Sequence, residues 1–328
     1  MKSVPLVTCV ISAMLFAAFA PNAAMALPVE QAREAIADRL VAEQAPGGFW
    51  PEEADFTGSI VAGMVSAYEV VGKAEYKAAA ELGGNFILKI AEGNFYGDEA
   101  YALARLTEIT EDTAYADAVR DFYDTLDTYG YIRGYQETDR SNAVFYMAYH
   151  AAAAYKVGAM DAGIWRQALI QYLSLIDDDV AYYPVMSLGV ATWALAQTGP
   201  LDDTKIDPFG LIGEEYWQDV TLSDLPDILV SHLVLTPSEG HAGTFYHRFD
   251  HAAAGEDFEA SGYAEDTIFS LLGLMAAATE EKDFYGEILG ATVVLCRPVT
   301  TDGIVYEHIW SGGETHYVYG GEMLQAIR

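Results

Sequence analysis

The chain has 328 residues, 52% of them hydrophobic, and carries 49 Asp and Glu against 17 Lys and Arg, for a net charge of −32. The negative electrostatic field of such a protein repels nucleic acid, anionic lipid and polyanionic glycans. The composition therefore excludes general binding of polyanions unless a local basic patch is present. Domains of about 300 residues bury roughly three quarters of their unfolded surface, so the length is sufficient for one large domain.

The N-terminus has the pattern of a secretory signal peptide. Lys2 is followed by an apolar run over Val4–Ala20 and by the small-residue triplet Ala24-Met25-Ala26. The run is shorter than the ~20 apolar residues that a membrane span needs, and a small-residue cleavage site follows it. We therefore expect cleavage after Ala26, one mature domain over residues 27–328, and a secreted or periplasmic protein that has no contact with the membrane after cleavage.

Cysteine usage removes one source of stability. Cys9 leaves with the signal peptide, and Cys296 is the only cysteine of the mature chain. No intramolecular disulfide can then form, although export usually permits them. Stability must come from burial of the core.

A repeat runs along the mature chain, in which a short segment of glycine and aromatic residues precedes an Ala-rich apolar helix. A fixed period of this kind is typical of repeat architectures. The turn segments are Gly47–Trp50, Gly93–Tyr96, Gly130–Arg133, Ala181–Pro184, Gly243–Tyr246 and Gly303–Tyr306. The helices that follow are predicted to begin near Thr57, Gly97, Ser141, Val185, Ala264 and Gly320. Because they are apolar on nearly every face, they must be buried on all sides.

Helices with one polar face alternate with the apolar ones. They are predicted at Val29–Gln44, Ala74–Ala91, Thr113–Thr128, Asp161–Leu175, Ser223–Leu235 and Glu280–Leu295. Alternation of this kind predicts an outer ring of helices around an inner ring, which is an all-α (α/α)6 toroid of six hairpins. An open solenoid would share the repeat but would need polar capping units. The last helix, Gly320–Ile327, is apolar, which favours the closed ring.

Residues 35–50 resemble the repeat of the terpenoid cyclase and protein prenyltransferase toroids. The matching residues are Gln44, Gly48 and Trp50, in a Gln-x-x-x-Gly-x-Trp arrangement. Gln can bond backbone at the helix end, Gly allows the turn, and Trp packs across the hairpin. At fold level the resemblance extends to six-hairpin glycosidases and to helical-toroid polysaccharide lyases, and a fold alone does not give a function.

The specific activities of the first two families are not supported by their motifs. A cyclase would need Asp-x-Asp-Asp, and the nearest match is Asp177-Asp178-Asp179 after Ile176, which departs from that pattern. A prenyltransferase would need a zinc site with a cysteine, yet Cys296 falls late in an outer helix. Terpenoid cyclase-like chemistry is accordingly kept only as a further alternative.

In a ring of paired helices, the N-termini of the inner helices gather at one mouth. The acids predicted there are Asp55, Asp98, Glu99, Asp139, Glu265, Asp266 and Glu322. A single acid at a helix start is more often a cap or a dipole partner than a catalyst. The pairs Asp98-Glu99 and Glu265-Asp266, however, each supply one acid more than a cap needs.

Paired carboxyls among aromatic rings point to glycoside hydrolysis, in which one acid with a raised pKa donates a proton while another activates water or attacks. We take Asp98, Glu99, Glu265 and Asp266 as first catalytic candidates, with Asp55 as a further one. The expected contacts to a glycan or other small ligand are Trp50, Tyr96, Tyr183, His247, Trp310 and Tyr317. No cofactor is expected. A non-catalytic protein that binds carbohydrate or a hydrophobic ligand is the alternative.

The longest interruption of the repeat, residues 199–262, lies between the fourth and fifth inner helices and holds His241, His247 and His251. If this segment is extended, Tyr246 and Arg248 face the same way. A polysaccharide lyase would use such a pair, with Arg neutralising a uronate carboxylate and Tyr or His moving the proton. The acidic charge disfavours a polyuronate substrate. No histidine spacing matches a metal-ligand signature, so no metal site is predicted, and His150 is expected to be a hydrogen-bonded core residue.

Overall fold

The computed structural model describes residues 26–135, 140–208, 215–235, 242–250, 262–310 and 312–327. Nearly all of the predicted signal peptide lies outside these ranges, as do Asp139, His241 and His251. No helix within the described ranges is long and apolar enough to cross a membrane.

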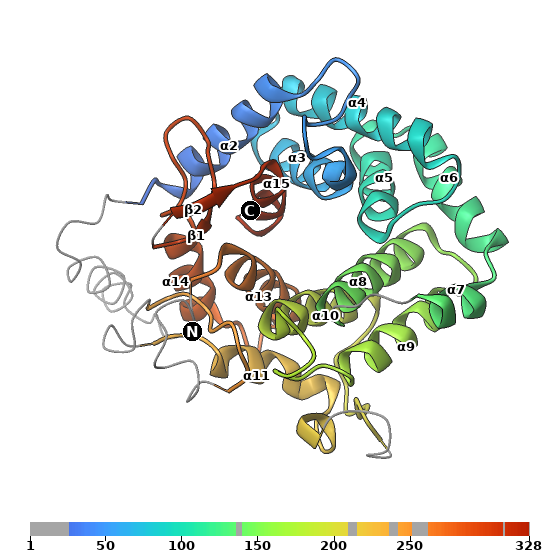
Figure 1. Cartoon of the computed structure of the whole chain (residues 1–328), viewed down its shortest axis with the longest axis vertical. Coiled ribbons are helices and arrows are strands. Elements are labelled where there is room, and N and C mark those ends of the chain that lie inside the picture. Colours follow the sequence, from blue (N-terminus) through green and yellow to red (C-terminus); the bar gives the residue numbers. More distant parts are fainter. Residues whose placement is uncertain are drawn as a thin grey trace, which may run out of the picture.

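In the described part of the chain, six buried helices form an inner ring. They are α3 (Thr57–Val71), α5 (Gly97–Thr110), α8 (Arg140–Val157), α10 (Pro184–Thr198), α13 (Ala264–Ala277) and α15 (Tyr317–Ala326). Each packs against the next, and α15 packs against α3, so the ring closes (Figure 1). The predicted (α/α)6 toroid is confirmed, and five of the six inner helices begin within one residue of the expected position.

A second set of helices surrounds this ring (Figure 1). They are α2 (Val29–Glu43), α4 (Ala74–Ala91), α6 (Thr113–Thr125), α9 (Ala162–Leu173), α11 (Leu225–Ser231) and α14 (Tyr285–Leu295). The weak pattern at residues 223–235 gives only the short helix α11, which begins with Pro226 in its first turn. Proline is tolerated there because its missing N–H has no helical partner in any case.

The structure corrects three local predictions. The turn expected at Gly130–Arg133 is part of a short helix, α7 (Thr128–Gly134), whose first turn is capped by Asp127. The last inner helix begins at Tyr317 rather than near Gly320, and an antiparallel hairpin of β1 (Tyr306–His308) and β2 (Gly312–Thr315) precedes it. The segment after Tyr246 bends instead of continuing as a strand, so the predicted alternation of faces does not form.

Short 3-10 turns connect several of these elements. They are η1 (Ala54–Phe56), η2 (Glu215–Trp217) and η3 (Leu222–Asp224). The first leads directly into α3, and the third leads into α11.

The ring closes through two glycines. A Cβ on Gly63 of α3 would lie 2.1 Å from the carbonyl oxygen of Gly321 on α15, and a Cβ on Gly321 would lie 2.5 Å from Cα of Ile60. Both distances are far below van der Waals contact, so only glycine permits this approach of the two backbones. The last hairpin can therefore pack directly on the first.

The repeat motif at the first hairpin is structural. The side-chain amide of Gln44 donates to the carbonyls of Gly48 and Ala79, at 3.1 and 2.9 Å. Gly48 has φ of 96°, a left-handed conformation that favours glycine. The indole N–H of Trp50 donates to the carbonyl of Leu40 at 2.8 Å. These bonds tie α2, its turn and α4 together, as the resemblance implied for glutamine and glycine.

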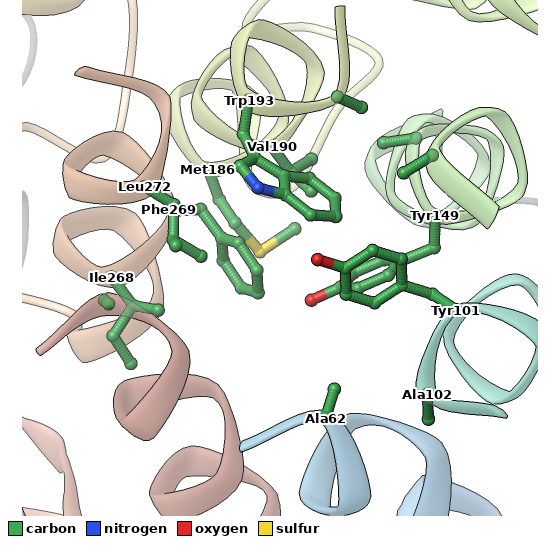
Figure 2. Packing of buried hydrophobic residues seen from close by; sticks show 14 of the residues in the cluster. Ala62, Tyr101, Ala102, Tyr149, Met186, Val190, Trp193, Ile268, Phe269 and Leu272 are labelled. Carbon is green, nitrogen blue, oxygen red and sulfur yellow. The ribbon is translucent and has the colours of Figure 1, made fainter. Parts of the chain in front are cut away.

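Aromatic side chains fill the centre of the ring. The ring of Trp193 lies edge-on to that of Tyr101, with centroids 5.1 Å apart, and Tyr149 contacts the same indole at 5.1 Å (Figure 2). Edge-to-face pairs of this kind stabilise a core by about 0.5–1.5 kcal/mol each beyond burial. His150 is fully buried on the same helix as Tyr149 and lies 3.0 Å from the hydroxyl of Tyr123, which confirms it as a bonded core histidine.

Candidate active site

A cavity of about 210 Å³ opens at the end of the ring where the inner helices begin. Its lining comes from the first two turns of the six inner helices and from the residues just before them. The lining residues are Phe56, Ser59, Asp98, Asn142, Phe145, Tyr146, Tyr183, Met186, Glu265, His316, Val318, Tyr319 and Glu322. Residues from distant parts of the chain thus meet at one mouth, as the repeat predicted.

Asp98 enters this cavity from the first turn of α5. Its side chain is 3% exposed, and Oδ2 accepts hydrogen bonds from the backbone N–H and the hydroxyl of Ser59, at 3.0 and 3.4 Å. A Cβ on Gly58 would lie 2.5 Å from the same oxygen, so glycine there allows the carboxyl to reach α3. Burial raises the pKa of Asp98 to about 6, although the hydrogen bonds from Ser59 oppose the rise.

Glu265 enters the cavity from the first turn of α13, and its side chain is half-buried. Burial, reinforced by the negative charge of Asp266 and of Glu307, raises the pKa of Glu265 to about 7. A carboxyl with such a pKa still holds its proton near neutral pH, so it can donate one.

Glu322, on α15, is the third carboxyl of the cavity. It is 3% exposed, and its Oε2 has no hydrogen-bond partner among the described residues. Burial and the charges of Glu265 and Asp98 raise the pKa of Glu322 well above its usual range. Glu265 and Asp98 thus act electrostatically on Glu322, so the three carboxyls form one site although each stands on a different hairpin.

The second acid of each predicted pair has another role. Oε2 of Glu99 accepts the backbone N–H of Tyr96 at 2.9 Å and so bonds back to the residue that precedes α5. Asp266 is fully buried; Oδ1 accepts the backbone N–H of Met186 at 3.2 Å, and Oδ2 lies 2.8 Å from Nδ1 of His247. Successive residues on an α-helix are about 100° apart. Accordingly, one acid of each pair, Asp98 or Glu265, lines the cavity.

Aromatic rings form much of the cavity wall. They are contributed by Phe56, Phe145, Tyr146, Tyr183 and Tyr319. Burial raises the pKa of Tyr183 to about 12, so this phenol stays protonated near neutral pH. Of the six predicted contacts to a ligand, Tyr183 is the one that lines the cavity.

Two of the other predicted contacts lie apart from the cavity. Trp50 is fully buried and has no surface for a ligand, because its indole packs inside the first hairpin. Tyr96 is 57% exposed, and its ring lies 5.9 Å from that of Tyr146, a wall residue.

The remaining three predicted contacts have partners of their own. The guanidinium of Arg297 lies 4.1 Å from the ring centroid of Trp310, and that of Arg39 lies 5.2 Å from the ring of Tyr317. His247 stands behind the cavity wall, edge-on to Tyr183 with centroids 5.2 Å apart.

The pair suggested for a lyase does not line the cavity. Arg248 donates through Nη1 to the carbonyls of Asp178 and Ala181, so it braces the loop at the end of α9. The backbone N–H of Tyr246 donates to the carbonyl of His232 at 2.9 Å. Asp55, the fifth catalytic candidate, is exposed in η1 and is likewise absent from the lining.

The acidic loop at residues 177–179 also holds backbone together. Oδ1 of Asp177 accepts the N–H groups of Asp179 and Val180, at 2.9 and 3.0 Å. Asp178 accepts those of Phe249 and Asp250, at 2.8 and 2.7 Å. Pockets of about 300 and 380 Å³ flank this loop. Neither gathers carboxyls from several inner helices, so we regard the mouth cavity as the candidate site.

Sequence reasoning missed the residue that fixes α15. Glu53 is buried and accepts the backbone N–H groups of Tyr317 and Val318, both at 2.8 Å, while its Oε1 lies 3.2 Å from Nδ1 of His316. A carboxylate at a helix N-terminus satisfies free N–H groups and favours the helix dipole. No local pattern could reveal this contact, because Glu53 and His316 are 263 residues apart.

No group of three or more His, Cys, Asp or Glu in the described ranges has the geometry to hold a metal ion.

Comparison with known proteins identifies the fold. No protein-family model and no curated protein sequence matches the chain. Among solved structures, an unsaturated glucuronyl hydrolase specific for heparin matches with a TM-score of 0.59 and 11% identity over 91% of this chain and 95% of that one. The α-1,6-mannanase GH76A from Salegentibacter sp. HEL1_6 matches with a TM-score of 0.56 and 12% identity, over 91% and 98%.

Two further structures have the same architecture. A polysaccharide lyase matches with a TM-score of 0.54 and 14% identity, over 91% of this chain and 95% of that one. An inactive variant of the mannanase, with two aspartates replaced by asparagine and α-1,6-mannotriose bound, matches with a TM-score of 0.51 and 10% identity, over 91% and 98%. At such low identities the likeness concerns the fold. The chain therefore shares the (α/α)6 toroid fold of these structures.

Proposed function

We propose that this protein is an exported glycoside hydrolase that works at the mouth cavity. The observation that carries the proposal is the meeting of Asp98, Glu265 and Glu322, from three different inner helices, in one cavity with aromatic walls. Paired carboxyls beside apolar rings are the machinery of glycosidic bond cleavage. Export rests on the N-terminal sequence pattern, and N-terminal sequencing of secreted protein would test it.

The environments of the carboxyls suggest their roles. Asp98 has a lower pKa than Glu265, about 6, because Ser59 donates hydrogen bonds to its carboxylate. Glu265, with a pKa of about 7, keeps its proton longer. Asp98 then acts as the base or nucleophile, and Glu265 as the general acid that protonates the leaving oxygen.

The structural neighbours support the choice of a glycan as substrate. The matched proteins are two hydrolases of glycans and a lyase of polysaccharides. The inactive mannanase variant lost activity through exchange of two aspartates for asparagine. We expect Asp98→Asn to inactivate this protein, because Asp98 lines the cavity.

A lyase is less well supported by the cavity. Its described lining contains no Arg or Lys that could neutralise a uronate carboxylate. Arg248 already bonds two backbone carbonyls outside the lining. The high pKa of Tyr183 keeps its phenol protonated near neutral pH, so very little phenolate is present to take up a proton.

Activity screening decides among these functions. Purified mature protein should release reducing ends from at least one member of an oligosaccharide panel, and Asp98→Asn should lower that rate roughly 10²- to 10⁴-fold. Asp121→Asn, an exposed change on outer helix α6, is the matched control. Products with unsaturated ends would replace the hydrolase with a lyase. Binding without turnover would indicate a non-catalytic protein.

A further inference from the structure

We infer that the mouth cavity selects a sugar that carries a protonated amino group, such as a hexosamine with a free amine, over neutral and carboxylated sugars. This inference names the substrate class of the proposed hydrolase and so rests on that function.

The cavity holds one carboxyl more than hydrolysis needs. A hydrolase uses two acids, and Asp98 and Glu265 fill those roles. Glu322 is left over, 3% exposed, with an Oε2 that has no partner among the described residues. A buried polar oxygen without a partner is costly. An ammonium group of a bound ligand would supply the missing donor, and its positive charge would favour the ionised form of Glu322.

The aromatic wall fits the same chemistry. Phe145, Tyr146 and Tyr319 line the cavity together with Glu322. Cations bind favourably over aromatic faces, and aromatic rings line sites that recognise ammonium ligands. A sugar ring would also pack on these faces, so one wall can serve both parts of an amino sugar.

The charge of the site disfavours an anionic sugar. The described lining has three carboxyls and neither Arg nor Lys. His316 is the cationic candidate of the lining, and it already lies 3.2 Å from Glu53 and 3.3 Å from Glu314. A uronate carboxylate would thus find no Arg or Lys to pair with and would meet the negative charge of Asp98, which is a repulsive element in specificity. The net charge of −32 further favours cations over anions near the protein surface.

Calorimetric titration with methyl glycosides tests the inference. The probes are the glycosides of glucosamine, N-acetylglucosamine, glucose and glucuronate, added to the wild-type protein. We expect the glucosaminide to bind roughly tenfold to a hundredfold tighter than the glucoside, as for a charge-assisted hydrogen bond. The N-acetylated glycoside, which has lost the charge, should bind no better than the glucoside.

Glu322→Gln should remove most of the preference for the amine, whereas Glu281→Gln, which removes one exposed charge outside the cavity, should keep it. Equal binding of all four probes, tightest binding of the glucuronide, or an unchanged preference in a folded Glu322→Gln variant would overturn the inference. Because calorimetry measures binding and not turnover, failure of this inference can be distinguished from failure of the proposed hydrolase. Amine preference without hydrolysis would refute only the proposed hydrolase, and hydrolysis of neutral sugars without amine preference would refute only this inference.

Discussion

Oδ2 of Asp266 lies 2.8 Å from Nδ1 of His247, in a pair that spans the insertion and the first turn of α13. Asp266 is fully buried, and the side chain of His247 is 15% exposed. The imidazole in turn lies edge-on to Tyr183, a wall residue of the cavity. The insertion thus supports the candidate site from behind.

This pair predicts a pH-dependent stability. Burial lowers the pKa of His247, but the Asp266 carboxylate raises it more, so the folded-state pKa lies above 6.5. The stabilisation is then complete below the unfolded pKa and is lost as the pH rises through the folded one. We expect His247→Asn to cost about 1.5–3 kcal/mol at about pH 5.5 and much less at about pH 9, measured by urea unfolding. An equal cost at both pH values would contradict the pair, and Asp266→Asn serves as the second arm of a double-mutant cycle.

The carboxyls of the cavity predict a narrow pH optimum for hydrolysis. Activity should rise as Asp98 ionises, with a pKa of about 6, and fall as Glu265 loses its proton, with a pKa of about 7. Because Asp98 and Glu265 both interact with Glu322, the two apparent pKa values of the profile belong to the three carboxyls together. The measurement is kcat/KM against pH. Glu265→Gln should lower the rate and remove the alkaline limb; persistence of that limb would assign the acid role elsewhere.

The seam between α3 and α15 predicts a large effect of one methyl group. Gly321→Ala would place a Cβ 2.5 Å from Cα of Ile60, and overpacking of this kind costs about 1–3 kcal/mol. Gly290→Ala on α14 is the control, because a Cβ there meets nothing within 4 Å and should stabilise by about 0.4–1 kcal/mol. Thermal unfolding should show a lower melting temperature for Gly321→Ala and a higher one for Gly290→Ala. Similar melting temperatures for the two variants would show that the seam relaxes.

Trp50→Phe separates a structural role from a role in binding. The variant removes the donor to the carbonyl of Leu40 in a fully buried position, which should cost about 1–3 kcal/mol. Because Trp50 has no surface at the cavity, KM should stay unchanged in the folded variant. A raised KM with unchanged stability would instead show that Trp50 contacts the ligand.

The sequence by itself determined the ring. Inner helices such as α3 and α10 are apolar on every side, and burial of such a helix is a property of its own residues, so the pattern could be read along the chain. The roles of Gln44 and Gly48 followed in the same way, because the hydrogen-bonding and conformational needs of a turn are local.

Only the tertiary structure decided which acids share the cavity. Asp98 and Glu99 are neighbours in sequence, and the direction each takes depends on Ser59 and Tyr96, which supply the hydrogen bonds. The local sequence of Glu322 contains no motif that sets it apart from the other acids of the mouth. Its burial in the ring, where α15 packs against α3 and α13, makes it a candidate for binding the ligand. The bond from Tyr96 to Glu99 is local, but the bond from Ser59 to Asp98 and the burial of Glu322 join different hairpins, and no local pattern encodes those contacts.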